Sequence, residues 1–217
     1  HRAAATPDRT AVIDVATNRQ WTARAFDAIV DGVTARFQSV LGDTLSSADD
    51  PRVGLLASTR IGFFAAVHAC WRAGYTAVPL DTQAPSNALK WRLDRAAVDL
   101  LVCEGTTEAT ALAAASCPVV SLDGPTDKRV DPLQPGPPEG DPPTPATWDR
   151  GDTALVLFTS GTTGEPKGVR LTLGNLVASA SGSAFRLGVA PGDRWLDCLP
   201  AYHMGGLAPV VRTALYG

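Results

Sequence analysis

The sequence predicts an α/β protein, with mostly parallel sheets flanked by helices. Two observations predict this fold class. Short runs of aliphatic and β-branched residues alternate with longer segments whose apolar residues recur at helical spacing. Such β-α-β alternation is typical of a parallel sheet that carries helices on both faces. The chain has 217 residues, of which 45% are hydrophobic, so it can bury a core of this kind.

Residues 1–122 are predicted to form one α/β subdomain. Its strands are expected at residues 52–58, 76–81, 99–104 and 118–123, and its helices at 60–74, 85–97 and 107–116. Gly74 is a good C-terminal signal for the first of these helices. Before them we expect a β-hairpin from residues 10–22 and a helix over 23–41 that Thr22 caps.

Residues 123–152 are predicted to be a Pro-rich linker or long surface loop. Nine of the chain's 17 prolines fall between Pro118 and Pro145, and charges and glycines fill the gaps. A strand at 153–158 then resumes the pattern. We expect residues 153–217 to form a phosphate-loop hairpin and the start of a second α/β subdomain that is truncated.

The stretch "FTSGTTGEPKGV" at residues 158–169 follows this strand at once. Ligand sites in open α/β sheets lie at the carboxyl ends of strands. Glycines let backbone N–H groups turn toward an anion, hydroxyls donate further hydrogen bonds, and a lysine adds positive charge. A flexible surface loop is the alternative. The pattern favours a polyphosphate site made of Thr159, Ser160, Gly161, Thr162, Thr163, Gly164, Lys167 and Gly168.

The P-loop of nucleoside triphosphatases, G-x-x-x-x-G-K-[ST], is the nearest rival pattern, and it does not fit. Pro166 stands where that motif has glycine, and Gly168 stands where it has serine or threonine. A helix should follow a P-loop, but "GVRLT" alternates like a strand. The loop is therefore expected to be the tip of a hairpin, and a P-loop phosphohydrolase is disfavoured.

The same stretch resembles the phosphate-binding signature of the adenylate-forming superfamily, which includes acyl-CoA synthetases, luciferases and the adenylation domains of peptide synthetases. "WRAGYTAVPLD" (Trp71 to Asp81) resembles the upstream "K-A-G-x-x-x-V-P-L-D" motif of that family. "LPAYHMGGL" (Leu199 to Leu207) resembles its downstream "L-P-x-x-H-x-x-G" motif. "RLTLGNL" matches "x-x-T-H-x-N-L", except that Leu173 stands where histidine is frequent.

The resemblance implies an AMP-forming acid–thiol ligase. A carboxylate attacks the α-phosphorus of ATP, and a thiol, usually that of coenzyme A, then displaces AMP from the acyl-adenylate. Thr159 to Gly168 would hold the β- and γ-phosphates with Mg²⁺, and Lys167 would stabilise the leaving pyrophosphate. The metal ligands stay unknown. A catalytically silent nucleotide-binding module is the alternative from another class.

His203 is the second candidate catalytic residue. The resemblance places it in the wall of the acyl pocket, where it orients the substrate carboxylate, and Gly205 and Gly206 would leave room for the substrate. A packed histidine is the alternative. It follows "RWLDCLP" at 194–200, which reads as strand-like. His68 lies inside an apolar helix and is interpreted as a core residue.

The stretch from Leu199 to Gly217 is most similar to the o-succinylbenzoate–CoA ligases of menaquinone synthesis, which often read "L-P-L-F-H-x-G-G-L" followed by an arginine and "L-Y-G". Arg212 would then bind the second carboxylate of the diacid, with a surface arginine as its alternative. Medium-chain and aromatic acyl-CoA synthetases share most of these residues. The family's later motifs are absent, so we expect a truncated piece that makes no acyl-CoA alone.

The composition and charge of the chain indicate which binding partners and which cellular compartment to expect. The net charge of −3 and the pI near 5.6 give no electrostatic reason to expect nucleic acid. No apolar run approaches the length of a membrane span, and no signal peptide is visible. Four separated cysteines without a C-x-x-C pair argue against zinc and for buried thiols in a reducing, cytoplasmic setting. A homo-oligomer is left open.

Overall fold

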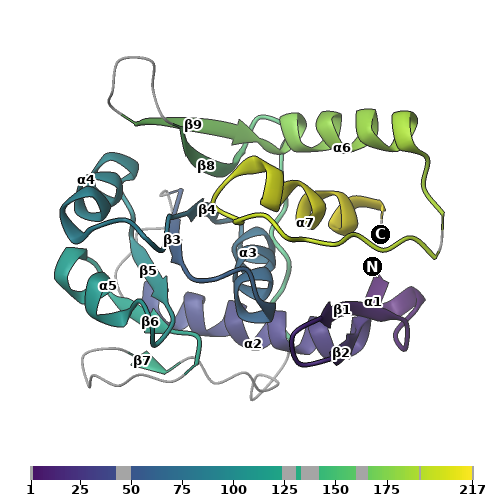
Figure 1. Cartoon of the computed structure of the whole chain (residues 1–217), viewed down its shortest axis with the longest axis horizontal. Helices are drawn as coiled ribbons and strands as arrows, with labels where there is room; N and C mark the ends of the chain where they lie inside the picture. Colours follow the sequence, from purple (N-terminus) through teal and green to yellow (C-terminus); the bar gives the residue numbers. More distant parts are fainter. Residues whose placement is uncertain are drawn as a thin grey trace.

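A seven-stranded sheet is the centre of the molecule in the computed structural model, which describes residues 2–42, 50–123, 131–132, 142–159, 166–190 and 192–216. The strand order is β7-β6-β5-β3-β4-β8-β9 (Figure 1). All neighbouring strands are parallel except β8 and β9, which are antiparallel. The predicted fold class is confirmed. The strands are β3 (Arg52–Leu56), β4 (Thr76–Pro79), β5 (Leu100–Cys103), β6 (Val119–Ser121), β7 (Asp131–Pro132), β8 (Thr153–Thr159) and β9 (Lys167–Thr172).

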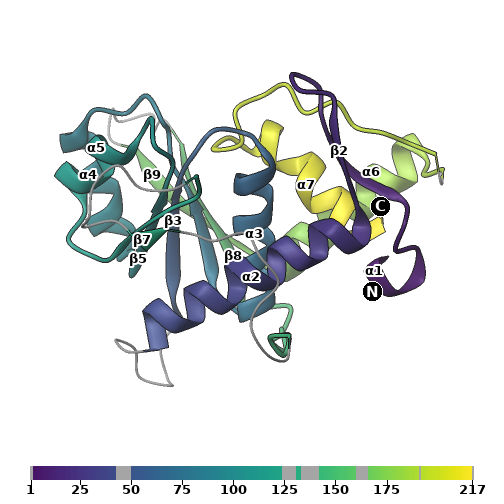
Figure 2. The ribbon, with the colours of Figure 1, turned by 90° about the horizontal axis from the view of Figure 1, so that it is seen from below.

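Helices cover both faces of this sheet (Figure 2). One face carries α4 (Ser86–Ala96) and α5 (Glu108–Ala114), whose apolar residues share a core with Leu56 and Val78. The other face carries α2 (Ala23–Gly42) and α3 (Ile61–Ala73). The four central strands are apolar on both sides, as expected for strands buried between two helical layers.

The N-terminal elements confirm the predicted hairpin and capped helix. After the short helix α1 (Arg2–Ala5), β1 (Thr10–Asp14) and β2 (Arg19–Thr22) pair antiparallel in a sheet of their own. The Thr22 hydroxyl accepts a hydrogen bond from the Ala25 N–H at 3.2 Å, which satisfies one of the free donors at the start of α2.

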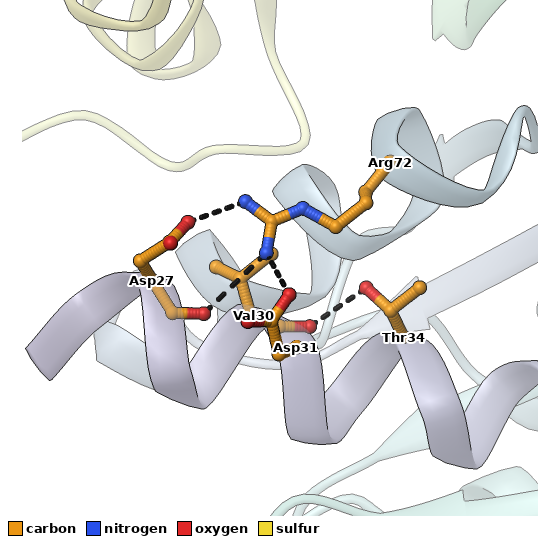
Figure 3. A network of polar contacts seen from close by, with 5 residues as sticks. All are labelled: Asp27, Val30, Asp31, Thr34 and Arg72. Atoms are coloured by element: carbon orange, nitrogen blue, oxygen red, sulfur yellow. Dashed lines mark hydrogen bonds and ion pairs between the residues drawn. The ribbon is translucent and has the colours of Figure 1, made fainter. Parts of the chain in front are cut away.

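Helix α3 is held in place by a glycine that ends it and by an arginine in its last turn. Gly74 adopts the left-handed conformation, with φ at 80°, as its position after the helix predicts. From the last turn, Arg72 reaches across to α2 and contacts the carboxylates of both Asp27 and Asp31 (Figure 3). Helices α2 and α3 are therefore joined by ion pairs as well as by apolar packing.

The predicted linker is described in part. Residues 142–149 have no regular structure, and β7 is a two-residue strand inside the predicted loop. The Trp148 indole N–H donates to the Trp71 carbonyl at 2.7 Å, so the end of the linker is anchored beneath α3. β8 then joins β4 in the same sheet, so strands on both sides of the linker share one sheet; the division into subdomains stays a prediction.

Two helices follow the hairpin: α6 (Leu173–Leu187) and α7 (Met204–Tyr216). The strand-like reading of 194–200 is wrong, because this segment has no regular structure. A strand needs a neighbour to satisfy its backbone, and among the described strands none pairs with it. Its apolar side chains are instead exposed, with Leu196 at 73%.

The cysteines only partly follow the prediction. Cys70 and Cys103 are buried, and burial raises the pKa of the Cys103 thiol to about 12, so both are inert apolar residues. Cys117 is half-buried. Cys198 is exposed, which makes the buried interpretation wrong for that residue because it lies in the irregular segment before α7. Among the described residues, no helix has the length and apolarity needed to cross a membrane.

Candidate nucleotide and acyl site

The predicted phosphate loop is held by the β8–β9 hairpin. Thr159, the last residue of β8, pairs with Lys167, the first residue of β9, and the Thr159 hydroxyl lies 3.5 Å from the Lys167 carbonyl oxygen. Both side chains are exposed, so a ligand can reach the hydroxyl and the ammonium. The hairpin interpretation is confirmed. Ser160, Gly161, Thr162, Thr163 and Gly164 lie outside the described residues.

Gly168 lies in β9 rather than in the turn, directly opposite Phe158. A Cβ at this position would lie 3.4 Å from the Val156 side chain, which is ordinary contact. The backbone there gives no steric reason for glycine. Phe158 in turn packs near Trp91 of α4, with ring centroids 6.0 Å apart, so α4 supports the base of the hairpin.

His203 is exposed in a turn that leads into α7. The turn is closed by the His203 N–H, which donates to the Pro200 carbonyl at 3.1 Å, and the His203 carbonyl accepts from Gly206 and Leu207 at the start of the helix. The Ala201 N–H donates to the Thr59 hydroxyl at 3.1 Å. Because Thr59 follows β3, this bond places the turn at the carboxyl edge of the sheet.

The carboxyl edge brings the two predicted sites together. β3, β4 and β8 are neighbouring parallel strands and therefore end on the same side. Thr59 follows the first and binds the His203 turn, Asp81 follows the second, and Thr159 ends the third and begins the phosphate loop. The same edge thus carries the Thr159 hydroxyl, the Lys167 ammonium and the turn that contains His203.

Gly205 and Gly206 were predicted to leave room for a substrate. A Cβ on Gly206 would lie 2.5 Å from the carbonyl oxygens of both Leu199 and Pro200. A Cβ on Gly205 would lie 3.0 Å from the Leu199 side chain. Close packing of the chain's own turn therefore explains Gly206 fully, and its part in substrate binding stays a prediction.

Arg212 lies on α7, as predicted, and its side chain is half-buried. The guanidinium carbon lies 5.1 Å from the centre of the Trp195 ring, a cation–π contact. Its Nε is buried and has no hydrogen-bond partner in the described part of the chain. A half-buried cation of this kind has donors available for an anion.

Sequence reasoning missed Trp195 and Tyr202, which contact the two candidate side chains. Trp195 was placed in the strand-like segment 194–200, and no role was assigned to Tyr202. The signal that could have found Tyr202 is its hydroxyl, which distinguishes it from the phenylalanine of the related pattern.

The described residues contain no group of three or more His, Cys, Asp or Glu side chains arranged to hold a metal ion. The hydroxyl of Thr159 and the charge of Lys167 suit phosphate oxygens, and the phosphates of a nucleotide could themselves carry Mg²⁺. The donor set therefore fits a magnesium nucleotide better than a metal held by protein ligands alone.

A parallel sheet whose carboxyl edge leads into a hydroxyl- and glycine-rich sequence is typical of nucleotide-binding α/β proteins. A family model described as AMP-binding enzyme matches residues 1–217. The chain therefore belongs to the AMP-binding enzyme family, which agrees with the resemblance to adenylate-forming enzymes.

Known relatives refine this similarity. A 2-succinylbenzoate–CoA ligase of Bacillus velezensis is 35% identical over 218 residues, which cover 100% of this chain and 41% of the relative. The Bacillus subtilis o-succinylbenzoate CoA synthetase (MenE) in complex with the acyl-adenylate OSB-AMP has a TM-score of 0.79 at 26% identity, covering 100% of this chain and 52% of that one. Its complex with ATP and magnesium ion has a TM-score of 0.80 at 26% identity, covering 100% and 54%. The chain thus spans about half or less of these relatives.

Proposed function

We propose that this protein is an ATP-dependent, AMP-forming acid–CoA ligase whose substrate is o-succinylbenzoate, acting in the cytoplasm in menaquinone synthesis. The observation that supports the proposal is the shared carboxyl edge: β8, which leads into the phosphate hairpin, and β3, whose following residue Thr59 binds the His203 turn, end on the same side of the sheet. The relatives named above, which are ligases for this acid, support it.

The proposed first step needs positioning more than covalent help from the protein. A carboxylate oxygen of the acid attacks the α-phosphorus of ATP, and the bond to pyrophosphate breaks. Thr159 and Lys167 would bind the β- and γ-phosphates, and Mg²⁺ would neutralise part of their charge. His203 would orient the attacking carboxylate. The thiol of coenzyme A then displaces AMP.

Arg212 would set the choice of acid. The substrate carries a second carboxylate, which must be paired if the pocket closes around it, because an unpaired buried charge is costly. Arg212 is held against Trp195 and keeps an unpaired Nε, so it has a donor to offer. Monocarboxylic acids would leave the guanidinium without this partner.

The test is a pyrophosphate-release and acyl-CoA assay of the full-length protein against o-succinylbenzoate, benzoate and a medium-chain fatty acid. We expect the diacid to be preferred. Arg212→Ala should raise KM for the diacid about 10- to 100-fold, the value of one charged hydrogen bond, and leave KM for ATP unchanged. Arg186→Ala, at an exposed position near the end of α6, is the matched control.

Equal or better use of the fatty acid would overturn the choice of substrate and leave the ligase class intact. Binding of ATP without adenylate formation from any acid would instead identify a silent nucleotide-binding module.

A further inference from the structure

Tyr202 links the candidate acyl-site histidine to the sheet. Its ring lies against the His203 imidazole, with centroids 4.3 Å apart and planes inclined by 52°. In the described part of the chain no hydrogen bond reaches the His203 ring, so this aromatic contact is what restrains its orientation. Aromatic pairs at this distance contribute beyond simple burial.

The other end of Tyr202 faces Asp81. The Asp81 carboxylate lies close enough to the Tyr202 hydroxyl for its negative charge to act on the pKa of that hydroxyl. Burial, followed by the nearby Asp81 charge, raises the pKa of Tyr202, so the hydroxyl keeps its proton and can act as a donor toward this carboxylate. The positive charge of Arg92 on α4 acts in the opposite direction.

Asp81 is itself rigidly placed. It lies just beyond β4, and its carboxylate accepts a hydrogen bond from the Gln83 N–H at 2.9 Å. Its carbonyl accepts from the Ala84 N–H at 3.1 Å, which closes the turn into α4. The carboxylate that faces the Tyr202 hydroxyl is therefore part of a fixed turn rather than of a mobile side chain.

The turn is anchored a second time from the neighbouring strand. The Thr59 hydroxyl, just beyond β3, accepts the Ala201 N–H at 3.1 Å. Ala201 is thus bonded to the residue just beyond β3, Tyr202 faces the residue just beyond β4, and His203 follows them directly. A restraint of this kind holds a side chain near its productive geometry before a ligand arrives.

We propose that Tyr202 is a positioning residue for His203, with Asp81 as its anchor, in the activation of the acid. The proposal rests on the proposed function for its kinetic consequence, but the positioning itself is a property of this chain. Misplacing a substrate-orienting group by about 1 Å can cost roughly 10²-fold in rate.

The experiment uses the full-length protein and separates the hydroxyl from the ring. Tyr202→Phe keeps the ring and matches the phenylalanine of the related motif, so it is expected to fold. It should lower kcat for adenylate formation by about 2- to 10-fold, the value of one net hydrogen bond, with KM for ATP unchanged. Tyr202→Ala removes both contacts and should lower kcat by about 10²-fold.

The anchor is tested with a double-mutant cycle. Asp81→Asn should resemble Tyr202→Phe, and the double variant should lose little more than either single variant, because both changes break one bond. Purely additive losses would overturn the role of Asp81. Wild-type kcat in both Tyr202→Phe and Tyr202→Ala, in a preparation whose wild type is active, would overturn the proposal.

A structural readout keeps the two proposals separate. The His203 imidazole signals, identified with a His203→Gln variant, should move in the NMR spectrum when the neighbouring ring is removed in Tyr202→Ala. Unchanged signals would overturn the positioning role whatever the activity. A wild type that makes no adenylate, but whose His203 signals move as expected, would overturn the proposed function alone.

Discussion

At the scale of single residues, the two described histidines have opposite environments. His203 is exposed in the turn before α7, whereas His68 packs edge-on against Phe26 and Trp71, with centroids 5.2 and 5.6 Å away. Burial, reinforced by the positive charge of Arg72, lowers the pKa of His68 to about 4. His68 is half-buried by accessible surface and enclosed by aromatic rings, so it lies at the edge of the core rather than inside it.

The pKa of His68 predicts acid sensitivity. The unfolded chain takes up a proton at this residue below pH 6.5, but the folded protein does so only near pH 4. Stability should therefore be full above pH 6.5 and fall as the pH drops toward 4. At ~1.4 kcal/mol per pKa unit, the largest loss is about 3 kcal/mol. Urea unfolding at several pH values measures it.

His68→Gln removes the titrating group and should flatten the pH dependence between 6.5 and 4. The matched control is His203→Gln, which changes an exposed histidine and should leave the slope as in the wild type. Equal slopes in His68→Gln and the wild type would show that other groups govern acid unfolding.

Lys167 is the residue whose loss should affect the chemistry most directly. Its ammonium is exposed at the first position of β9, next to the phosphate loop. Lys167→Ala should slow adenylate formation about 10²-fold, because one group that stabilises developing negative charge is lost. Single-turnover measurement of pyrophosphate release by the full-length protein tests this. A normal rate would make Lys167 a solvated surface residue.

At the scale of elements, the sequence signals that act through local backbone geometry predicted the helix and strand ends well. Gly74, Thr22 and the alternation in "GVRLT" act through local hydrogen bonds and steric limits, and each ends or begins an element as expected. The strand prediction for 194–200 failed. The alternation of this segment resembles a strand, but no described neighbouring strand supplies a hydrogen-bond ladder. Whether such a partner exists is decided by distant parts of the chain.

Helix α6 offers a test of local signals at this scale. The Thr172 hydroxyl accepts the Asn175 N–H at 3.2 Å, and the Asn175 side chain accepts the Thr172 N–H at 3.0 Å. Thr172→Ala breaks this reciprocal cap and should cost about 1 kcal/mol. Thr172→Ser keeps the hydroxyl and is the control. Equal urea midpoints for the two variants would show that the cap contributes nothing.

At the scale of the whole molecule, the sequence predicted a parallel sheet but not its order. The alternation of strands and helices shows that crossovers exist, and a crossover can return the chain on either side of a strand. The placement of β8 beside β4, across the long linker, depends on contacts such as the Trp148 indole bond to Trp71. A single aromatic residue in a Pro-rich segment carries no sign of that role.

The Arg72 cluster fastens α2 to the rest of the fold and should matter for global stability. Only 13% of the Arg72 side chain is exposed, and it meets two carboxylates on α2. Arg72→Ala leaves both carboxylates without their cation and should cost about 3 kcal/mol. Arg24→Ala breaks an ion pair whose arginine is 69% exposed and should change stability by less than about 1 kcal/mol. Equal urea midpoints for both variants would contradict this difference.

The position of β9 at the rim of the sheet has a consequence for self-association. An edge strand offers unpaired N–H and C=O groups to a second molecule, and charged side chains discourage such pairing. The Arg170 guanidinium is turned back onto the Thr153 hydroxyl at 3.1 Å, which leaves Lys167 as the outward charge of this strand among the described residues. Lys167→Ala would therefore favour edge-to-edge dimers and larger aggregates, and light scattering at the assay concentration must accompany its kinetics.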